Sequence, residues 1–437
     1  MPMTALPISA APPPTDGVAL RRRTTTLALL TAAYFFSYMD RQILAILQED
    51  IRAELHLSDT QLGLLAGFAF AIFYATLGLP VARLADRGNR VNIIAVALTL
   101  WSAMTAVCGL AQNFVQLLLA RIGVGIGEAG SSPPSHSIIA DLYPADQRAG
   151  AMGIYSLGVV LGSAFGTMIG GFVAHLYGWR AAMFAVGLPG IALAVVIKLF
   201  VVEPRRGMSD GPIASGRGST DQAPGFMAGF RSLFANRAAV HLVMGVTLTS
   251  MIGYGQTAFG PSFLIRSIGL SKVEIASIVA PVAAICGTLS AVGGGWLADR
   301  VARRWGLFAQ SWMVLAMKTV GLPLSFLFYL ATDAWVAVPL YWLSLLLTQS
   351  YLGPTFALIQ GLAPLRLRAL WAAVTLLVIN LIGLGLGPTL IGIVSDLLKP
   401  RLGDAESLRW AMLTLAAVTP WALFHYWRAG ALLKRAA

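Results

Sequence analysis

The sequence predicts an all-α membrane protein with twelve transmembrane helices in two pseudo-symmetric six-helix bundles. The first observation is composition: of 437 residues, 57% are hydrophobic and 11% are charged, whereas soluble chains are about one quarter charged. Second, the apolar residues form twelve runs that are each long enough to cross a bilayer. Third, one long polar segment divides the chain, and related sequences lie on both sides of it.

Charge and reactive residues exclude other classes of protein. The net charge of +12 comes from short arginine clusters between apolar runs, without the basic stripe or interleaved aromatics of a nucleic-acid-binding surface. Cys108 and Cys286 lie in apolar runs, as small core residues do. The five histidines lack metal-ligand spacing, and no nucleophile elbow or phosphate loop is present. We expect no nucleic-acid partner, no metal, no cofactor and no enzymatic activity.

The chain starts with a Pro-rich tail, residues 1–24, which we expect to be disordered and cytoplasmic. The apolar run behind Arg21, Arg22 and Arg23 has no convincing cleavage site, so it is predicted to be an uncleaved first helix. The predicted spans are 25–49, 59–84, 91–111, 114–141, 147–176, 180–202, 239–266, 272–299, 307–331, 335–361, 367–397 and 407–431.

The distribution of positive charge predicts the orientation. An even number of spans puts both termini on one side, and that side carries about twenty Lys and Arg against about seven on the other, a positive-inside signal. We therefore expect a multi-pass protein of a bacterial inner (plasma) membrane, with both termini cytoplasmic. We also expect it to act as a monomer.

The polar segment 203–237 is predicted to be a cytoplasmic linker between an N-terminal six-helix bundle, 25–202, and a C-terminal bundle with a short tail, 238–437. The halves repeat each other at one sequence offset. The segment Leu57–Gln61 (LSDTQ) matches Leu270–Glu274 (LSKVE), and in each the serine and the residue three positions later fit a capping box. About twenty residues later, RLADR at 83–87 matches WLADR at 296–300. A second register relates Pro134, Pro144 and Arg148 to Pro354, Pro364 and Arg368.

Four charges lie inside apolar runs of the first half: Asp40 and Arg41 on the first span, and Arg121 and Glu128 on the fourth. Arg121 and Glu128 are two helical turns apart, so they share one helix face, roughly 10 Å apart along the axis. That span is rich in Gly and Pro, which a membrane helix tolerates where neighbours or water satisfy its backbone. Charges at such depth mark a substrate or proton site, or a static brace between helices.

The second half carries no matching carboxylate, because Thr348 stands at the position of Glu128. Its one deep charge is Lys318, which either contacts substrate or reaches outward to lipid. Tyr254, Gln349 and Asn380 are candidate polar wall residues of a binding site, although each is also typical of a helix–helix contact.

The repeated segments resemble a known family. RLADRGNR at 83–90 and GWLADRVARR at 295–304 look like the paired signature of the major facilitator superfamily, although the first copy has Ala82 and Asn89 where glycines are usual. The glycines at 158, 162, 166, 170 and 171 resemble that superfamily's glycine-packed fifth helix, for which close packing is the plainer explanation. Within the superfamily, YMDR at 38–41, LSDTQLGLL at 57–65, Arg121 with GEA at 127–129, and IADL at 139–142 with DQR at 146–148 resemble the Spinster lipid transporters.

The resemblance implies a central cavity that helices one and four both line. Asp40 and Glu128 then become candidates for proton binding, because a buried carboxylate can take up a proton while arginine stays charged. Arg41 and Arg121 would be their partners or would bind an anionic head group, together with Lys318, Tyr254, Gln349 and Asn380. The signature segments imply gating residues at the cytoplasmic ends: Asp86, Arg87, Arg90, Arg148, Asp299, Arg300, Arg303, Arg304 and Arg368.

Three functions remain open at this point. The first is a secondary active transporter working by alternating access, coupled to protons, for an amphiphilic anionic lipid such as a lysophospholipid or a sphingosine-phosphate-like molecule. The second is a proton symporter for a small organic anion. The third is a non-transporting membrane receptor built on a transporter fold.

Overall fold

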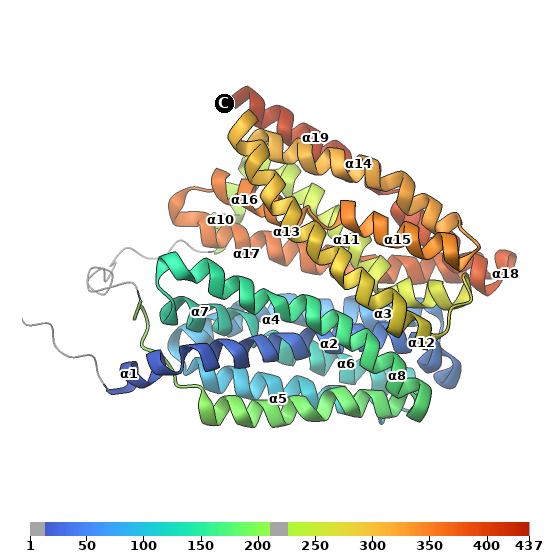
Figure 1. Ribbon diagram of the computed structural model, residues 1–437, viewed down its shortest axis with the longest axis horizontal. Helices are drawn as coiled ribbons and strands as arrows, with labels where there is room; N and C mark the ends of the chain where they lie inside the picture. Colours follow the sequence, from blue (N-terminus) through green and yellow to red (C-terminus); the bar gives the residue numbers. More distant parts are fainter. Residues whose placement is uncertain (1–13, 210–225, 437) are drawn as a thin grey trace, which may run out of the picture.

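The computed structural model describes residues 14–209 and 226–436, and regular structure in these residues is helical throughout (Figure 1). The first half contains helices α1 to α8: α1 Pro14–Arg21, α2 Arg23–Leu55, α3 Asp59–Ala66, α4 Phe68–Arg87, α5 Arg90–Cys108, α6 Phe114–Glu128, α7 Ser132–Leu142 and α8 Ala145–Phe200.

The second half begins after the linker. Its elements are α10 Phe226–Ala235, α11 Arg237–Arg266, α12 Lys272–Glu274, η1 Ile275–Val279, α13 Ala280–Trp305, α14 Phe308–Leu330, α15 Ala334–Thr348, α16 Leu352–Leu362, η2 Leu365–Leu367, α17 Arg368–Val378, η3 Ile379–Leu384, α18 Gly385–Ala416 and α19 Thr419–Ala436.

These helices make twelve spans within the described residues, which confirms the predicted fold class. Eight continuous helical stretches are long and apolar enough to cross a membrane. Two of the eight, Asp146–Phe200 and Leu370–Arg435, are long enough to cross twice. Each contains a glycine with positive φ, Gly178 at 83° and Gly403 at 79°, where the chain turns back. The other two spans are α2, with Asp40 and Arg41, and the pair α6–α7, with Arg121 and Glu128.

Two predicted details of the helix starts are confirmed, and two segments differ from expectation. Ser58 with Gln61 and Ser271 with Glu274 both form complete capping boxes. The tail that we expected to be disordered contains α1, while residues 1–13 lie outside the described part of the chain. The segment predicted as a linker contains helix α10, whose Leu233 is buried against the second half.

Close packing explains the glycines of the fifth span. A Cβ at Gly162 would lie 2.3 Å from the carbonyl oxygen of Phe35, and one at Gly166 would lie 2.6 Å from that of Met39. Both contacts are with α2, so α8 and α2 approach backbone to backbone, as the spacing of small residues predicted.

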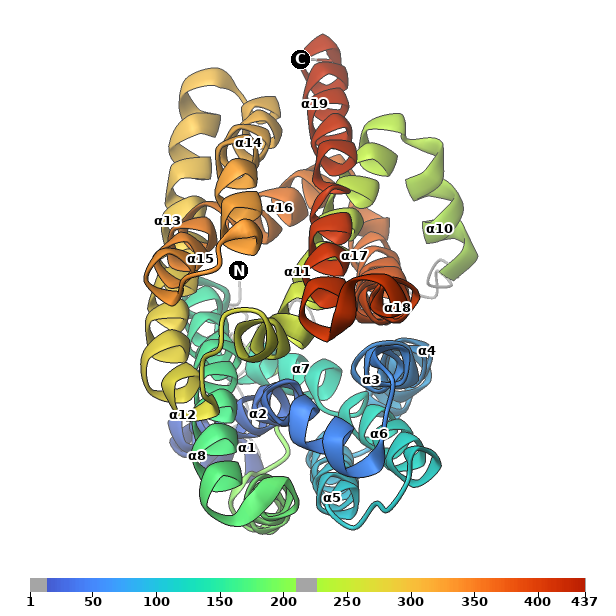
Figure 2. The same ribbon diagram turned by 90° about the vertical axis from the view of Figure 1, so that its right-hand side faces the viewer.

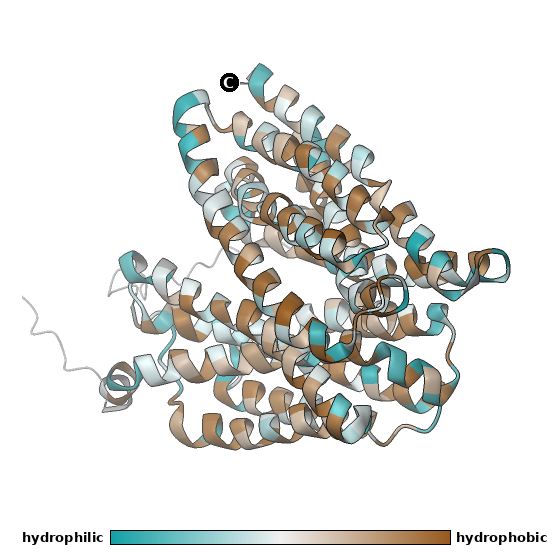
Figure 3. Cartoon of the chain, turned by 45° about the vertical axis from the view of Figure 1, so that its right-hand side comes forward, coloured by the Kyte–Doolittle hydropathy of each residue, from teal (hydrophilic) through white to brown (hydrophobic). Residues whose placement is uncertain are grey.

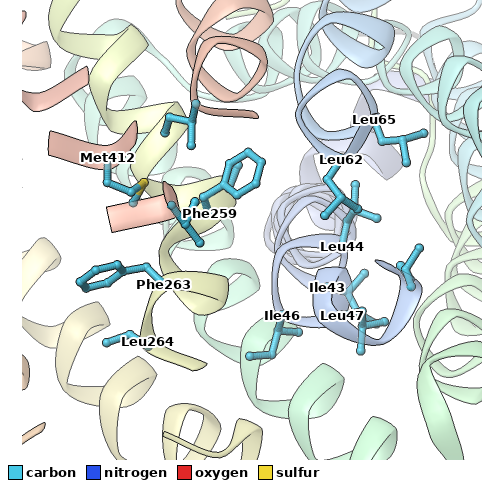
Figure 4. Packing of buried hydrophobic residues seen from close by; sticks show 14 of the residues in the cluster. Ile43, Leu44, Ile46, Leu47, Leu62, Leu65, Phe259, Phe263, Leu264 and Met412 are labelled. Carbon is cyan, nitrogen blue, oxygen red and sulfur yellow. The ribbon is translucent and has the colours of Figure 1, made fainter. Parts of the chain in front are cut away.

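The halves are joined at the end of the bundle opposite the linker, called the joined end below. Figure 3 shows the two halves meeting there and diverging toward the end where residues 203–209 and α10 lie, called the linker end. A buried apolar cluster crosses between the halves near the joined end. Figure 4 shows part of this cluster, with Ile43, Leu44, Ile46, Leu47, Leu62 and Leu65 on the first half and Phe259, Phe263, Leu264 and Met412 on the second.

A network of ion pairs covers this cluster at the joined end. The guanidinium of Arg266 binds both carboxylate oxygens of Asp59, at 2.9 and 2.8 Å, and its Nε donates to Glu49. The carboxylate of Asp396 accepts hydrogen bonds from the backbone N–H groups of Asp59 (3.0 Å) and Thr60 (2.7 Å), so one half caps a helix of the other. Two further ion pairs cross the interface, Arg52–Asp404 and Lys272–Asp50.

Backbone contact completes the joined end. A Cβ at Gly63 would lie 2.5 Å from the carbonyl oxygen of Pro388, and one at Gly392 would lie 2.2 Å from that of Asp59. Glycine at these two positions therefore allows the backbones of α3 and α18 to come into contact. Figure 2 shows these two helices side by side.

Candidate functional site

Two buried ion pairs form the centre of the first half. Arg121 Nη1 lies 3.1 Å from Asp40 Oδ2, and Arg41 donates from both Nε (2.9 Å) and Nη2 (2.6 Å) to Glu128 Oε2. The structure thus brings together the four charges that the sequence placed near one another. The neighbours Asp40 and Arg41 on α2 each pair with a different residue of α6.

Two hydroxyl groups fix the carboxylates in place. Thr105 Oγ1 donates to Asp40 Oδ1 at 2.5 Å, and Ser37 Oγ donates to Glu128 Oε2 at 2.8 Å. Glu128 is the last residue of α6, and the chain resumes a helix only at Ser132. The Gly- and Pro-rich sequence thus breaks the fourth span directly after its carboxylate.

Aromatic rings surround the guanidinium of Arg41. Its Cζ lies 5.0 Å from the ring centroid of Tyr38 and 4.8 Å from those of Phe70 and Tyr74. The Phe70 ring also lies 5.6 Å from Cζ of Arg121, so this one ring contacts both arginines. Each desolvated cation–π contact contributes up to about 2 kcal/mol, and the rings hold both cations in position.

Exposure differs sharply within the cluster. The Arg41 side chain keeps 15% of its surface exposed, whereas the side chains of Asp40, Arg121 and Glu128 keep 2%, 3% and 0%. Two buried atoms, Glu128 Oε1 and Arg121 Nε, have no hydrogen-bond partner among the described residues. Oε1 is therefore the free atom of Glu128 for a proton, because Oε2 already accepts from Ser37 and Arg41. The sequence treated the two arginines alike, but only Arg41 is placed to meet another molecule.

Lys318 lies in a separate site of the second half. Its side chain is buried, and its Nζ donates to the backbone carbonyl of Thr348 at 3.1 Å and lies 4.7 Å from the ring centroid of Tyr351. It therefore does not reach outward to lipid. It borders a cavity of about 50 Å³, which Gln256 and Gln349 also line.

The other predicted wall residues lie outside this cavity. Tyr254 on α11 belongs to the second half, but it packs against the apolar cluster of the first half that contains Phe70, so it lies at the interface between the halves. Asn380 lies in the π-helical segment η3, which packs against α11 and α4. The structure thus groups Gln349 with Lys318, Tyr254 with the interface, and Asn380 with a third region.

The predicted gating residues lie at the linker end. Asp86, Arg87, Asp299 and Arg368 are exposed there, as are Arg300, Arg303 and Arg304. Arg148 donates to the carbonyl oxygens of Ala140 (2.8 Å) and Tyr143 (3.3 Å). The predicted pairs Asp86–Arg148 and Asp299–Arg368 are not among the ion pairs of the described residues in this conformation.

Arg90 stands apart from the other predicted gating residues because it is fully buried. It pairs with Asp141 and, at 2.6 Å, with Glu203, and it donates to the carbonyl oxygen of Pro204 at 2.7 Å. Arg90 thereby ties α5 to α7 and to the first residues of the linker, all within one half.

Sequence reasoning missed several residues of the site. Ser37 lies one helical turn before Arg41, so helical spacing offered a signal for it. Thr105, Phe70 and Tyr74 offered none, because they come from other helices and resemble ordinary residues of an apolar span. The ion-pair network of the joined end was also missed, because its charges lie where loops begin and are usually solvated.

Comparison with known proteins adds the family. The model of the Major Facilitator Superfamily matches residues 30–388. The chain belongs to this superfamily. As a major facilitator transporter, it has the two six-helix halves described above, and the match includes both buried ion pairs and Lys318.

Relatives place this major facilitator transporter more closely. It is 34% identical over 402 residues to an MFS-type efflux pump of Mycolicibacterium smegmatis, covering 91% of this chain and 90% of that protein. It superposes with a TM-score of 0.83 on a bacterial homolog of the human lysosomal transporter Spinster, solved in an inward-facing and unoccupied conformation. That pair is 31% identical, covering 93% of this chain and 97% of the other. The transporter is therefore Spinster-like.

A third relative is named for the substrate L-galactonate. The chain is 27% identical over 304 residues to a probable L-galactonate transporter of Escherichia coli, covering 66% of this chain and 65% of that protein.

Proposed function

We propose that this Spinster-like transporter moves an amphiphilic anionic lipid, such as a lysophospholipid or a sphingosine-phosphate-like molecule, by proton-coupled alternating access. The observation that carries the proposal is the difference in exposure between Arg41 and the three charges around it. Arg41 is open to an incoming anion, while Asp40 and Glu128 are buried carboxylates able to hold a proton.

The coupling follows from competition for one guanidinium. An anionic head group that binds Arg41 takes hydrogen bonds that Glu128 now accepts. A buried carboxylate that loses its cation is costly as an anion, so Glu128 takes up a proton. By linkage, protonation of Glu128 in turn frees Arg41 for the anion. Asp40, held by Arg121 and Thr105, is the second proton-binding candidate.

The second half supplies the rest of the proposed substrate surface. Tyr254 packs against the cluster that contains Phe70, whose ring contacts Arg41, and Lys318 with Gln349 and Tyr351 borders the second-half cavity. Asn380 is the remaining residue of the proposed substrate surface. Arg121 acts on substrate only through Asp40 and Phe70, because its own side chain is buried.

A second candidate is a proton symporter for a small organic anion. Two observations favour it: the cavity beside Lys318 holds only about 50 Å³, which is too small for an acyl chain, and one relative is a probable L-galactonate transporter.

The orientation and the gates belong to the same proposal. We infer that the linker end is cytoplasmic, in a bacterial plasma membrane, and that the chain acts as a monomer. When the linker end closes, Asp86 pairs with Arg148 and Asp299 with Arg368, while the neighbouring arginines of both signature segments line that end. Alkaline phosphatase fused at either terminus should be inactive in cells, and an active fusion would contradict the orientation.

Uptake into proteoliposomes tests the function directly. Purified protein is given radiolabelled lysophospholipid or a small organic anion such as galactonate, each with and without a pH gradient. We expect the lysophospholipid to accumulate only with the gradient and only with the wild-type protein, not with Glu128→Gln. Accumulation of the small anion alone would support the second candidate, and gradient-independent transport of the lysolipid would refute proton coupling.

A further inference from the structure

A cavity at the linker end of the second half has no part in the transport site. It measures about 400 Å³ and lies where α13 ends, α14 begins and α19 ends. Its walls include three aromatic rings, two aliphatic side chains and one cation: Trp305, Phe308, Trp312, Val301, Met313 and Lys434. Its volume is in the usual range for small-molecule sites, about 300–1,000 Å³.

Packing fixes the shape of this cavity. The indole of Trp312 lies against α19 because residue 430 is glycine, where a Cβ would come 2.2 Å from its Nε1. Nε1 of Trp312 donates to the carbonyl oxygen of Trp427 at 3.3 Å, and the ring meets Phe308 edge to face at 5.5 Å. The aromatic wall is therefore held in place by two helices.

Positive charge lies against the aromatic walls of the cavity. Nζ of Lys434 lies 5.4 Å from the ring centroid of Trp312 and 5.8 Å from that of Phe308, and the Arg304 guanidinium lies 5.2 Å from that of Trp305. Residues 299–308 and 430–435 together contain five Lys or Arg and one Asp. The surrounding surface is apolar, with Trp305 56% and Leu307 64% exposed.

We propose that this cavity binds an anionic phospholipid of the surrounding bilayer. The acyl chain lies against Phe308, Trp312 and Met313, and the phosphate binds Lys434 and Arg304. The apolar walls exclude a soluble anion, and the cations disfavour a zwitterionic lipid relative to an anionic one. Basic pockets between transmembrane helices recognise lipid head groups in this way. The site is separate from the proposed transport path, because neither buried ion pair lines it.

Native mass spectrometry of the full chain in detergent tests the proposal. The protein is titrated with phosphatidylglycerol and with phosphatidylcholine of the same acyl chains. We expect phosphatidylglycerol to bind more tightly, and Lys434→Glu to weaken its binding at least about tenfold, because two units of charge change. Lys434→Ala should have a smaller effect in the same direction. The matched control is Arg401→Glu, an exposed arginine at the joined end, which should bind as the wild type does.

Brominated phosphatidylglycerol locates the acyl chain. The fraction of tryptophan fluorescence that this lipid quenches should be smaller in Trp312→Phe than in the wild type. The control is Trp335→Phe, at a residue that is 88% exposed and far from the cavity. In this variant the difference in quenching between brominated phosphatidylglycerol and brominated phosphatidylcholine should stay as in the wild type. Equal binding of the two lipids, unchanged in both Lys434 variants, would overturn the proposal. The proposal would also be overturned if the protein showed no preference between the two lipids and formed a dimer that Lys434→Glu dissociates. A second copy of the chain would then occupy the cavity.

Discussion

In each half of the transporter one membrane span is interrupted, and the groups that bind at the two interruptions differ. In the first half α6 ends at Glu128, and a cation from another helix, Arg41, binds its carboxylate. In the second half α15 ends at Thr348, the position that the internal repeat relates to Glu128, and Lys318 binds its backbone carbonyl. Both breaks receive a cation, as the negative end of a helix dipole favours. Among the described residues, only the break in the first half also contains a carboxylate.

The difference also sets the size of the expected effects. Removing one partner of a buried ion pair costs about 3–5 kcal/mol, because a charge is left uncompensated. A hydrogen bond from a charged group to a carbonyl contributes about 1.5–3 kcal/mol. Substitutions in the first half should therefore affect the transport cycle more than substitutions around Lys318.

The largest effect is expected from the two carboxylates. Glu128→Gln keeps the shape of the side chain and removes its titration, so uptake driven by a pH gradient should vanish while substrate binding largely persists. Asp40→Asn should act in the same direction. Transport and binding are each measured across a range of pH. If both variants kept the wild-type response to the gradient, the four charges would be a static brace.

The next effect should separate the two arginines. Arg41 makes two hydrogen bonds to Glu128 and contacts three rings, whereas Arg121 makes one bond to Asp40. A lysine keeps the charge but not the planar donor. Arg41→Lys should therefore lower transport about tenfold or more, corresponding to at least about 1.4 kcal/mol, and Arg121→Lys less. Equal losses in the two variants would contradict the proposed difference between Arg41 and Arg121.

Lys318→Ala should change substrate preference more than coupling, because no carboxylate accompanies this lysine among its contacts in the described residues. Uptake of anionic substrates should fall several-fold, with neutral analogues little affected and the dependence on a pH gradient kept. Gln349→Ala, beside the same cavity, serves as the comparison variant. An equal loss for anionic and neutral substrates would make Lys318 a structural support for the end of α15.

The smallest effect should come from the repeated gate positions. Asp86→Asn and Asp299→Asn each remove one expected pair from the closed linker end, so each should favour the conformation described here by about 1 kcal/mol or less, as exposed pairs do. Single cysteines at the two ends report the change through their labelling rates. Unchanged labelling at both ends in Asp86→Asn would rule out its role as a gate.

These contrasts were only partly accessible from the sequence. Long apolar runs, the two capping boxes and the glycine spacing of α8 are local patterns, and the structure matches them. The sequence predicted that Asp40, Arg41, Arg121 and Glu128 lie close together, because they lie at similar depths in two spans that line one cavity. Which acid pairs with which arginine depends on how α2 rotates against α6, and no local pattern contains that angle. The partners of Arg266 likewise come from α2 and α3, more than two hundred residues away along the chain.

The joined end has a consequence for the solution around the protein. There the two halves are bound through Arg266 with Asp59 and Glu49 and through Arg52 with Asp404, and the Arg52–Asp404 pair reaches the surface, with the Asp404 side chain 41% exposed. Dissolved ions screen such charges, with a Debye length of about 10 Å at 0.1 M and about 3 Å at 1 M. The apolar cluster beneath them responds in the opposite sense, because strongly hydrated salts such as sulfate favour apolar burial. Chloride and sulfate at equal ionic strength should therefore shift the balance between the two conformations by different amounts.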